Sequence, residues 1–214
     1  MGSSESKSQK PSDQPGCFNK SGGKKFDICL ATLGLDNAGK TSIVLSLAKE
    51  LPEEGVLPTV GFDSKKIMLH GHSVTLYDLG GGTKIRGIWK NYLAEVHGII
   101  YVVDASDPAR VEESAKEFKT ICQNTFVHYK PMLILANKSD KDEALSEYEL
   151  TERMDLEEIV NVNHIPTKIQ ASTTTTKDHK TLKEGMKWLY SAIESDWETL
   201  EERVKQDILD TKVQ

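Results

Sequence analysis

Short apolar runs alternate with amphipathic segments along the chain from residue 26 onward. The run at residues 98–103 is continuously apolar, which is typical of a parallel strand buried on both faces. Residues 182–212 instead repeat apolar side chains every three or four positions, which predicts a helix. The predicted strands are residues 28–33, 62–69, 73–79, 98–103, 132–136 and 167–170. The predicted helices are residues 42–50, 85–96, 108–125, 154–160 and 182–212.

The order of these elements predicts an α/β fold. A hairpin is expected around the turn His70-Gly71-His72, so one strand is antiparallel to its neighbour. Helical crossovers join the other strands, which predicts a mostly parallel six-stranded sheet with helices on both faces. Ser106-Asp107-Pro108 supplies a cap and a first-turn proline for the helix at 108–125. Ligands bind in such folds at the loops that leave the carboxyl ends of the strands.

The last predicted helix is long for a domain of this size. As one continuous helix, residues 182–212 would span about 45 Å at 1.5 Å per residue. Its apolar stripe consists of Leu189, Ile193, Trp197, Leu200, Val204 and Ile208. Two interpretations stay open: the stripe packs along its own domain, or the helix is an extension that binds a partner.

Residues 34–41 carry the strongest chemical signal. They read Gly-Leu-Asp-Asn-Ala-Gly-Lys-Thr between a predicted buried strand and a helix, which is the context of a phosphate-binding loop. Backbone N–H groups and the Lys40 ammonium would bind phosphates, and the Thr41 hydroxyl would bind Mg²⁺. The candidate phosphate-binding residues are Gly34, Asp36, Asn37, Ala38, Gly39, Lys40, Thr41 and Ser42. The alternative is an ordinary glycine-rich turn.

A second motif predicts a metal site that depends on the third phosphate. Asp78 ends a strand and precedes three glycines, so its carboxylate can hold Mg²⁺ through water. The N–H of Gly81 can reach a terminal phosphate, and Thr59 can add a second hydroxyl to the metal. Both loop contacts would be lost on hydrolysis, which is how such loops change their order.

A third motif, Asn137-Lys138-Ser139-Asp140, follows a predicted strand and points to guanine. The Asp140 carboxylate can accept hydrogen bonds from N1 and N2 of guanine, and adenine offers no equivalent pair. Asn137 can support the loop and the Lys138 stem can cover the base. The sequence therefore predicts GTP or GDP with Mg²⁺ as cofactors. The alternative is a polar turn that caps the next helix.

These motifs resemble the ADP-ribosylation factor-like branch of the small GTPases over residues 26 to about 195. Within that branch, residues 78–82 and 85–92 look most like the type 13 group. The resemblance implies the P-loop small GTPase fold, with a GTPase domain at 26–195 and a helical extension at 196–214. It also implies effectors and regulators of the GTP state, a ciliary or flagellar location on the cytoplasmic side of membranes, and exchange activity on ADP-ribosylation factor-like protein 3.

The resemblance also assigns roles to aromatic residues and exposes two departures. Phe62, Tyr77 and Tyr92 correspond to an aromatic trio that reads the switch out to effectors, although a role in the core is the alternative. Gly82 stands where most relatives have the glutamine that orients the attacking water, so weak intrinsic hydrolysis is expected. The base-covering loop is altered, and its candidate N–H donors are those of Ser172, Thr173 and Thr174.

Composition narrows the class of partner. The net charge of −6 argues against nucleic acid, and the scattered cysteines fit a reducing compartment. The sequence lacks a membrane-spanning apolar run, so a soluble or peripherally attached protein is expected. Residues 1–25 are polar and are predicted to be disordered. Gly2 fits a myristoylation signal and Cys17 a palmitoylation site, which predicts membrane attachment; the alternative is an ordinary or artificial Met-Gly-Ser start.

Two functional classes remain open. The first is a nucleotide-dependent binding module that docks partners or promotes exchange on a related GTPase in its GTP state. The second is a conventional GTP hydrolase of membrane traffic whose catalysis a partner completes. Gly82 favours the first class, and Asn137 and Asp140 argue against a third, an ATP-using phosphotransferase.

Overall fold

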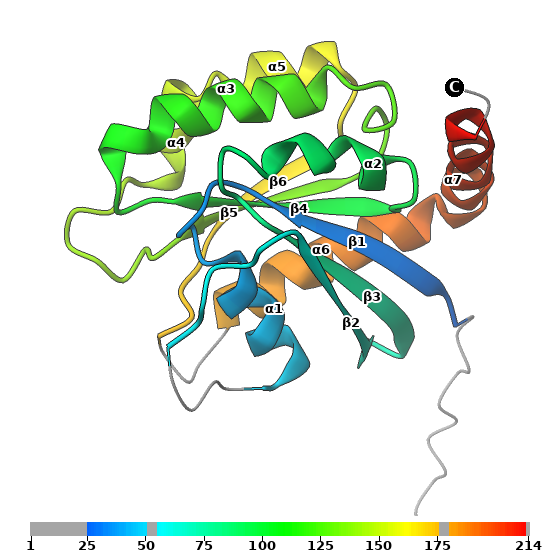
Figure 1. Cartoon of the computed structure of the whole chain (residues 1–214), viewed down its shortest axis with the longest axis horizontal. Coiled ribbons are helices and arrows are strands. Elements are labelled where there is room, and N and C mark those ends of the chain that lie inside the picture. The colour runs from blue at the N-terminus through cyan, green and yellow to red at the C-terminus, as the bar shows by residue number, and fades with distance from the viewer. Residues whose placement is uncertain (1–24, 51–54, 176–179, 213–214) are drawn as a thin grey trace, which may run out of the picture.

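The computed structural model describes residues 25–50, 55–175 and 180–212 (Figure 1). The predicted tail, with Gly2 and Cys17, lies outside them except for its last residue. A six-stranded sheet in the order β2-β3-β1-β4-β5-β6 forms the centre of the described part. Its strands are β1 Asp27–Leu33, β2 Phe62–Leu69, β3 His72–Leu79, β4 Gly98–Asp104, β5 Met132–Asn137 and β6 Thr167–Ala171. Only the β2–β3 pair is antiparallel among the described pairs, which confirms the predicted sheet.

Helices cover both faces of the sheet (Figure 1). The described helices are α1 Lys40–Ala48, α2 Lys90–Leu93, α3 Val111–Cys122, α4 Glu147–Arg153, α5 Leu156–Val162, α6 Lys180–Ser195 and α7 Trp197–Thr211. The position of β4 between two helical layers explains why its residues are continuously apolar. Ile99, Tyr101 and Val103 pack into the core beneath α3, α4 and α5, whereas Ile100 and Val102 pack into the core beneath α1 and α6. Both faces of the strand are therefore buried.

The strand register brings the predicted motifs to one edge. Thr32 in β1 pairs with Asp78 in β3, and Asp104 in β4 pairs with Asn137 in β5. Because these four strands are parallel and end at the same edge, the loops that follow them meet there.

The helices predicted at 85–96, 108–125 and 154–160 differ from the structure in their middle or bounds, and the one predicted at 42–50 is α1, two residues nearer the N-terminus. Residues 85–96 form a 3₁₀ turn, Arg86–Ile88, and the short α2, because the side chains of Arg86 and Trp89 turn back to bind loop carbonyls. Asp107 makes no capping hydrogen bond; a 3₁₀ turn, Pro108–Arg110, precedes α3, which ends at Cys122. The prediction for 154–160 corresponds to α5.

Helix α4, which is seven residues long, was not predicted from the sequence. Its start does carry a capping box. The Ser146 hydroxyl accepts from the N–H of Glu149 at 3.2 Å, and the Glu149 carboxylate accepts from the N–H of Ser146 at 2.9 Å.

The predicted continuous helix at 182–212 is wrong. The backbone leaves helical geometry at Asp196, with φ −129° and ψ 29°, and α7 starts in a new direction. Leu200 and Val204 of α7 are buried against the domain, so the apolar stripe serves the protein's own core and is not a free partner surface. None of the described helices is both long and apolar enough to cross a bilayer.

A buried ion pair fixes α7. The Lys130 side chain is 0% exposed, and its Nζ lies 2.9 Å from the Asp207 carboxylate. The same ammonium donates to the carbonyl of Leu93 at 2.9 Å. A buried charge needs such partners, so α7 completes the environment of a residue inside the domain.

Four rings stack at the other edge of the sheet, where β1, β3 and β4 begin. Trp197 lies between Phe26 and His97, with ring centroids at 4.4 Å and 4.9 Å, and His72 stacks on the other side of Phe26 at 5.1 Å. We call His72, Phe26, Trp197 and His97 the histidine stack. It joins the strand starts to the beginning of α7.

Both histidines of the stack use both ring nitrogens. Nδ1 of His72 accepts from the N–H of Phe26, and Nδ1 of His97 accepts from the N–H of Cys29. The Nε2 atoms face carboxylates, Glu194 for His72 and Glu201 for His97. An Nδ1 that accepts carries no proton, so the neutral ring with hydrogen on Nε2 fits these partners.

Candidate functional site

The loops at the carboxyl edge of the sheet enclose a cavity of about 590 Å³. Its lining brings together the three motifs, the first and last of which are more than 90 residues apart in sequence. The lining residues are Asp36, Asn37, Gly39, Lys40, Thr41, Ser42, Val56, Leu57, Pro58, Thr59, Val60, Gly81, Gly82, Ile85, Asn137, Lys138, Asp140, Lys141, Thr173, Thr174 and Thr175. Gly34, Ala38, Asp78 and Ser172 are predicted site residues that lie behind this lining.

The phosphate loop presents a buried lysine to the cavity. Lys40 is 6% exposed, and its Nζ donates to the carbonyl of Leu35 at 2.8 Å. Burial lowers the pKa of Lys40 to about 8, and the carboxylates of Asp78 and Asp36 oppose that shift. An ammonium held by a single carbonyl still has two N–H donors for an anion.

Three oxygen donors converge below the phosphate loop. The Thr41 hydroxyl donates to Asp78 Oδ2 at 2.6 Å, and the Thr59 hydroxyl donates to the same oxygen at 3.1 Å. The two hydroxyl oxygens are 2.9 Å apart. Asp78 Oδ1 is buried and has no hydrogen-bond partner. Hydroxyl and carboxylate oxygens are the donors that Mg²⁺ prefers, so this group fits a magnesium ion.

Asn137 connects the two ends of the cavity. Its side chain is buried, and its amide donates to the carbonyl of Ala38 in the phosphate loop at 2.8 Å. Gly39 must be glycine here, because its φ is +94° and a Cβ would lie 2.2 Å from the Asn137 amide nitrogen. The predicted base-binding and phosphate-binding motifs therefore form one unit.

Asp140 lies at the far end of the cavity. Its carboxylate accepts from the Thr175 hydroxyl at 3.0 Å, and a hydrogen bond from Thr173 is the largest cause of its lowered pKa. The carboxylate is therefore ionised at neutral pH, as an acceptor must be. Lys138 is held separately, because its ammonium donates to the Asp104 carboxylate at 2.6 Å.

The structure separates the three candidates in the base-covering loop. The N–H of Ser172 donates to the carbonyl of Ala136 at 2.9 Å, and its own carbonyl accepts from the N–H of Ser139. Ser172 is fully buried, so it holds two loops together and does not face the cavity. Thr173 and Thr174 line the cavity, together with Thr175, which the sequence analysis missed.

Two side chains hold the triple-glycine loop. Arg86 Nε donates to the carbonyl of Gly81 at 2.7 Å, and the Trp89 indole donates to the carbonyl of Gly80 at 2.9 Å. Gly82 lies just beyond these contacts, and a Cβ there would meet only Ile85, at 3.9 Å. The position can accept a side chain, so its lack of one is not imposed by packing.

The three predicted effector aromatics form one cluster beside this loop. Tyr92 lies between Phe62 and Tyr77, with ring centroids at 5.2 Å and 5.3 Å. The two tyrosines are partly buried against the core, whereas Phe62 is 54% exposed. Exposed Val60 and Leu57 continue the apolar surface along the preceding loop.

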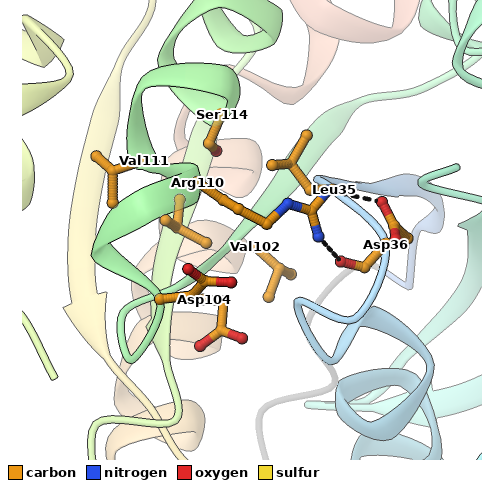
Figure 2. A pocket seen from close by; sticks show the side chains of 9 residues that line it. Leu35, Asp36, Val102, Asp104, Arg110, Val111 and Ser114 are labelled. Atoms are coloured by element: carbon orange, nitrogen blue, oxygen red, sulfur yellow. Dashed lines mark hydrogen bonds and ion pairs between the residues drawn. The ribbon is translucent and has the colours of Figure 1, made fainter. Parts of the chain in front are cut away.

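Arg110, the residue directly before α3, contacts the phosphate loop from outside the cavity. Figure 2 shows the Arg110 guanidinium directed at Asp36, in a narrow pocket between that loop and α3. Nη2 donates to Asp36 Oδ1 at 2.8 Å and Nη1 donates to the Asp36 carbonyl at 3.1 Å. No sequence pattern indicates this contact, because the two residues are 74 positions apart.

The profile of the ADP-ribosylation factor family matches residues 16–193 of this sequence. The chain belongs to the ADP-ribosylation factor family. It is therefore a small GTPase of the ADP-ribosylation factor-like type, a GTP-binding switch whose family binds guanine nucleotide and generally requires Mg²⁺. The resemblance noted in the sequence is confirmed at this level.

Two relatives and one solved structure show where in the family the chain lies. ADP-ribosylation factor-like protein 13B of Chlamydomonas reinhardtii is 39% identical over 181 residues, which are 84% of this chain and 34% of that protein. ADP-ribosylation factor-like protein 3 of the same alga is 35% identical over 170 residues, which are 79% of this chain and 93% of that protein. The chain thus spans about a third of the type 13B relative.

The solved structure is the Arl6 BBS3 small GTPase of Trypanosoma brucei with the bound nucleotide analogue GppNp. It superposes with a TM-score of 0.72 at 28% identity, over 79% of this chain and 98% of that one. The small GTPase fold is therefore shared over nearly the whole of the neighbour.

Proposed function

We propose that this protein is a GTP-dependent switch with weak intrinsic hydrolysis, which engages partners in its triphosphate state. The observation that carries the proposal is the Asn137–Ala38 hydrogen bond, which joins a predicted guanine motif to a phosphate loop around one cavity. A purine and its polyphosphate can then bind at opposite ends of a single site.

The residues have distinct roles in this proposal. Lys40 and the N–H groups of residues 36–42 bind the phosphates, and Asp140 binds the guanine edge with N–H groups of Thr173 and Thr174. Thr41, Thr59 and, through water, Asp78 would hold Mg²⁺, which neutralises phosphate charge when bound. Because Thr59 and Gly81 come from loops, a terminal phosphate that binds both would order those loops.

Gly82 supports the weak hydrolysis. A glutamine at this position orients water in other small GTPases, and losing one preorganised polar contact costs on the order of 10²-fold in rate. The alternative is a conventional GTPase of membrane traffic whose partner supplies the missing group, and the open space around Gly82 would accommodate such a group.

We further propose that the aromatic cluster docks those partners. Phe62 is the exposed member, and the cluster adjoins both nucleotide-dependent loops. The similarity to ADP-ribosylation factor-like protein 13B supports exchange activity on a related GTPase such as ADP-ribosylation factor-like protein 3 and a ciliary or flagellar membrane location. Lipids on Gly2 and Cys17 would provide the membrane attachment.

The experiment is a nucleotide assay on the purified chain. We expect GTP and GDP, and not ATP, to displace a fluorescent guanine nucleotide, and equal displacement by ATP would refute the proposal. In single-turnover assays, Gly82→Gln should raise GTP hydrolysis by about 10²-fold. Gly87→Gln, the same change at another open position close to this loop, is the matched control and should leave the rate unchanged. A fast wild-type rate would favour the conventional hydrolase.

A further inference from the structure

Asp36 places a carboxylate where a polyphosphate must bind. The residue belongs to the phosphate loop and lines the cavity, and its side chain is 49% exposed. It lies at the terminal-phosphate end, because the backbone of Gly81 packs directly on it: a Cβ on Gly81 would lie 2.3 Å from the Asp36 nitrogen. Asp140 and the threonine loop are at the opposite end.

A negative charge at this position discriminates between nucleotides. Coulomb repulsion falls with distance, so a free Asp36 carboxylate opposes the last phosphate of a triphosphate more than the phosphates of a diphosphate. Protonation does not remove this negative charge, because the hydrogen bond from Arg110 lowers the pKa of Asp36 below its ordinary value. The charge must be balanced by the protein.

Arg110 is built to balance it. Its guanidinium binds Asp36 at two points, the carboxylate at 2.8 Å and the carbonyl at 3.1 Å, and so restrains the side chain as well as neutralising it (Figure 2). Its third contact, from Nε to Glu113 at 3.0 Å, holds the guanidinium in place. Two-point contacts of this kind give arginine a fixed orientation that lysine cannot reproduce.

Arg86 is less able to take this role. Its Nη2 is 3.5 Å from Asp36 Oδ1, but the same nitrogen donates to Glu113 at 2.6 Å. Its other nitrogens donate to Glu117 and to the carbonyl of Gly81. The guanidinium is therefore committed to the triple-glycine loop and α3.

We propose that Arg110 is a specificity-determining residue: by binding Asp36 from outside the cavity, it removes a charge that would otherwise select against triphosphates. The inference deepens the proposed function and rests on it. It concerns the ratio of GTP to GDP affinity, whereas the proposed function concerns whether guanine nucleotides bind at all.

The test compares Arg110→Ala with the double variant Arg110→Ala/Asp36→Asn. Dissociation constants are measured for fluorescent GDP and for fluorescent GppNp, a GTP analogue that is not hydrolysed, with Mg²⁺ present. Arg110→Ala should weaken GppNp about tenfold and GDP less than about twofold. The double variant should restore GppNp affinity, because the carboxylate is gone. Arg153→Ala removes an equal charge from an exposed site on α4 and is the control.

Each other outcome overturns the inference. Equal loss of both nucleotides in Arg110→Ala would show that the arginine merely supports the loop. Loss of GppNp that Asp36→Asn does not restore would show that Arg110 acts on the phosphate directly. An unchanged affinity for both nucleotides in Arg110→Ala would show that Arg110 has no role in nucleotide binding. If the wild-type protein bound neither GppNp nor GDP, the proposed function itself would fail. That failure would be distinct from a failure of the inference about the affinity ratio.

Discussion

The two edges of the central sheet are built from similar polar groups that are used in opposite ways. At the carboxyl edge, Thr41 and Thr59 both donate to one oxygen of Asp78 while its other oxygen has no partner. At the amino edge, His72 and His97 use both ring nitrogens and stack on aromatic rings. The first arrangement can exchange its bonds for those of a ligand, whereas the second is complete within the protein.

Two buried lysines show the same contrast between a group that is open to a ligand and one that is fully paired within the protein. Lys40 and Lys130 both have a pKa lowered by burial. Lys130 is balanced by the Asp207 carboxylate at 2.9 Å, but the nearest polar atom bound to Lys40 is a neutral carbonyl. The carboxylates of Asp78 and Asp36 offset only part of the cost of burying Lys40, so an anion bound to its ammonium would be stabilising. The incompletely balanced lysine therefore marks the carboxyl edge of the sheet as the functional one.

The largest expected effect separates these lysines. Lys40→Met should weaken nucleotide binding by more than about 100-fold, since charged hydrogen bonds to phosphate are lost, and should leave the free energy of unfolding without nucleotide unchanged or higher. Lys130→Met should lower that free energy by about 3 kcal/mol, because Asp207 loses its partner, and should leave affinity unchanged. Nucleotide titration and urea unfolding measure both. Equal effects of the two substitutions would abolish the comparison.

A smaller effect is expected from the centre of the histidine stack. Trp197→Ala removes the ring between Phe26 and His97 and should lower the free energy of unfolding by about 2 kcal/mol, less than for a fully buried tryptophan because Trp197 is half-buried. Nucleotide affinity should be unchanged. Tyr148→Ala, which removes an aromatic ring that is 72% exposed, is the control. A loss of affinity in Trp197→Ala would show that the two edges are coupled.

The smallest effect is a pH dependence. Burial lowers the pKa of His97, and the charge of Lys130 adds to this, while Glu201 opposes it. The unfolded chain therefore binds more protons than the folded protein once the pH falls below about 6.5, so stability should fall from pH 7 to pH 5. His97→Gln should flatten this slope. The carboxyls with lowered pKa values act below about pH 4.5 and do not contribute in this window. An unchanged slope would mean that the ring is not held neutral.

The sequence predicted what depends on short-range pattern. Continuous apolar strands such as β4 and the loop at 34–41 were found because period and spacing carry them. The break at Asp196 could not be found this way, because the apolar stripe continues across it from Ile193 to Leu200. What ends α6 is the packing of α7 on Lys130 and His97, which no local pattern records.

The same limit explains the site. The motifs at Lys40, Asp78 and Asn137 are local and were predicted, and the cavity brings Lys40 and Asn137 together in its lining. The Arg110–Asp36 contact joins residues far apart in sequence, and Thr175 faces Asp140 only because β6 ends beside β5. Ser172 was grouped with its neighbours because a sequence cannot show that its N–H is already occupied.

The Lys130–Asp207 pair has a consequence for folding during translation. A ribosome makes the sheet and its first helices well before residue 207, so the nascent domain collapses around an ammonium that still lacks its counter-ion. Maturation of the interior must wait until α7 has left the exit tunnel. The docking of α7 onto Lys130 is therefore a late step in the folding of this domain.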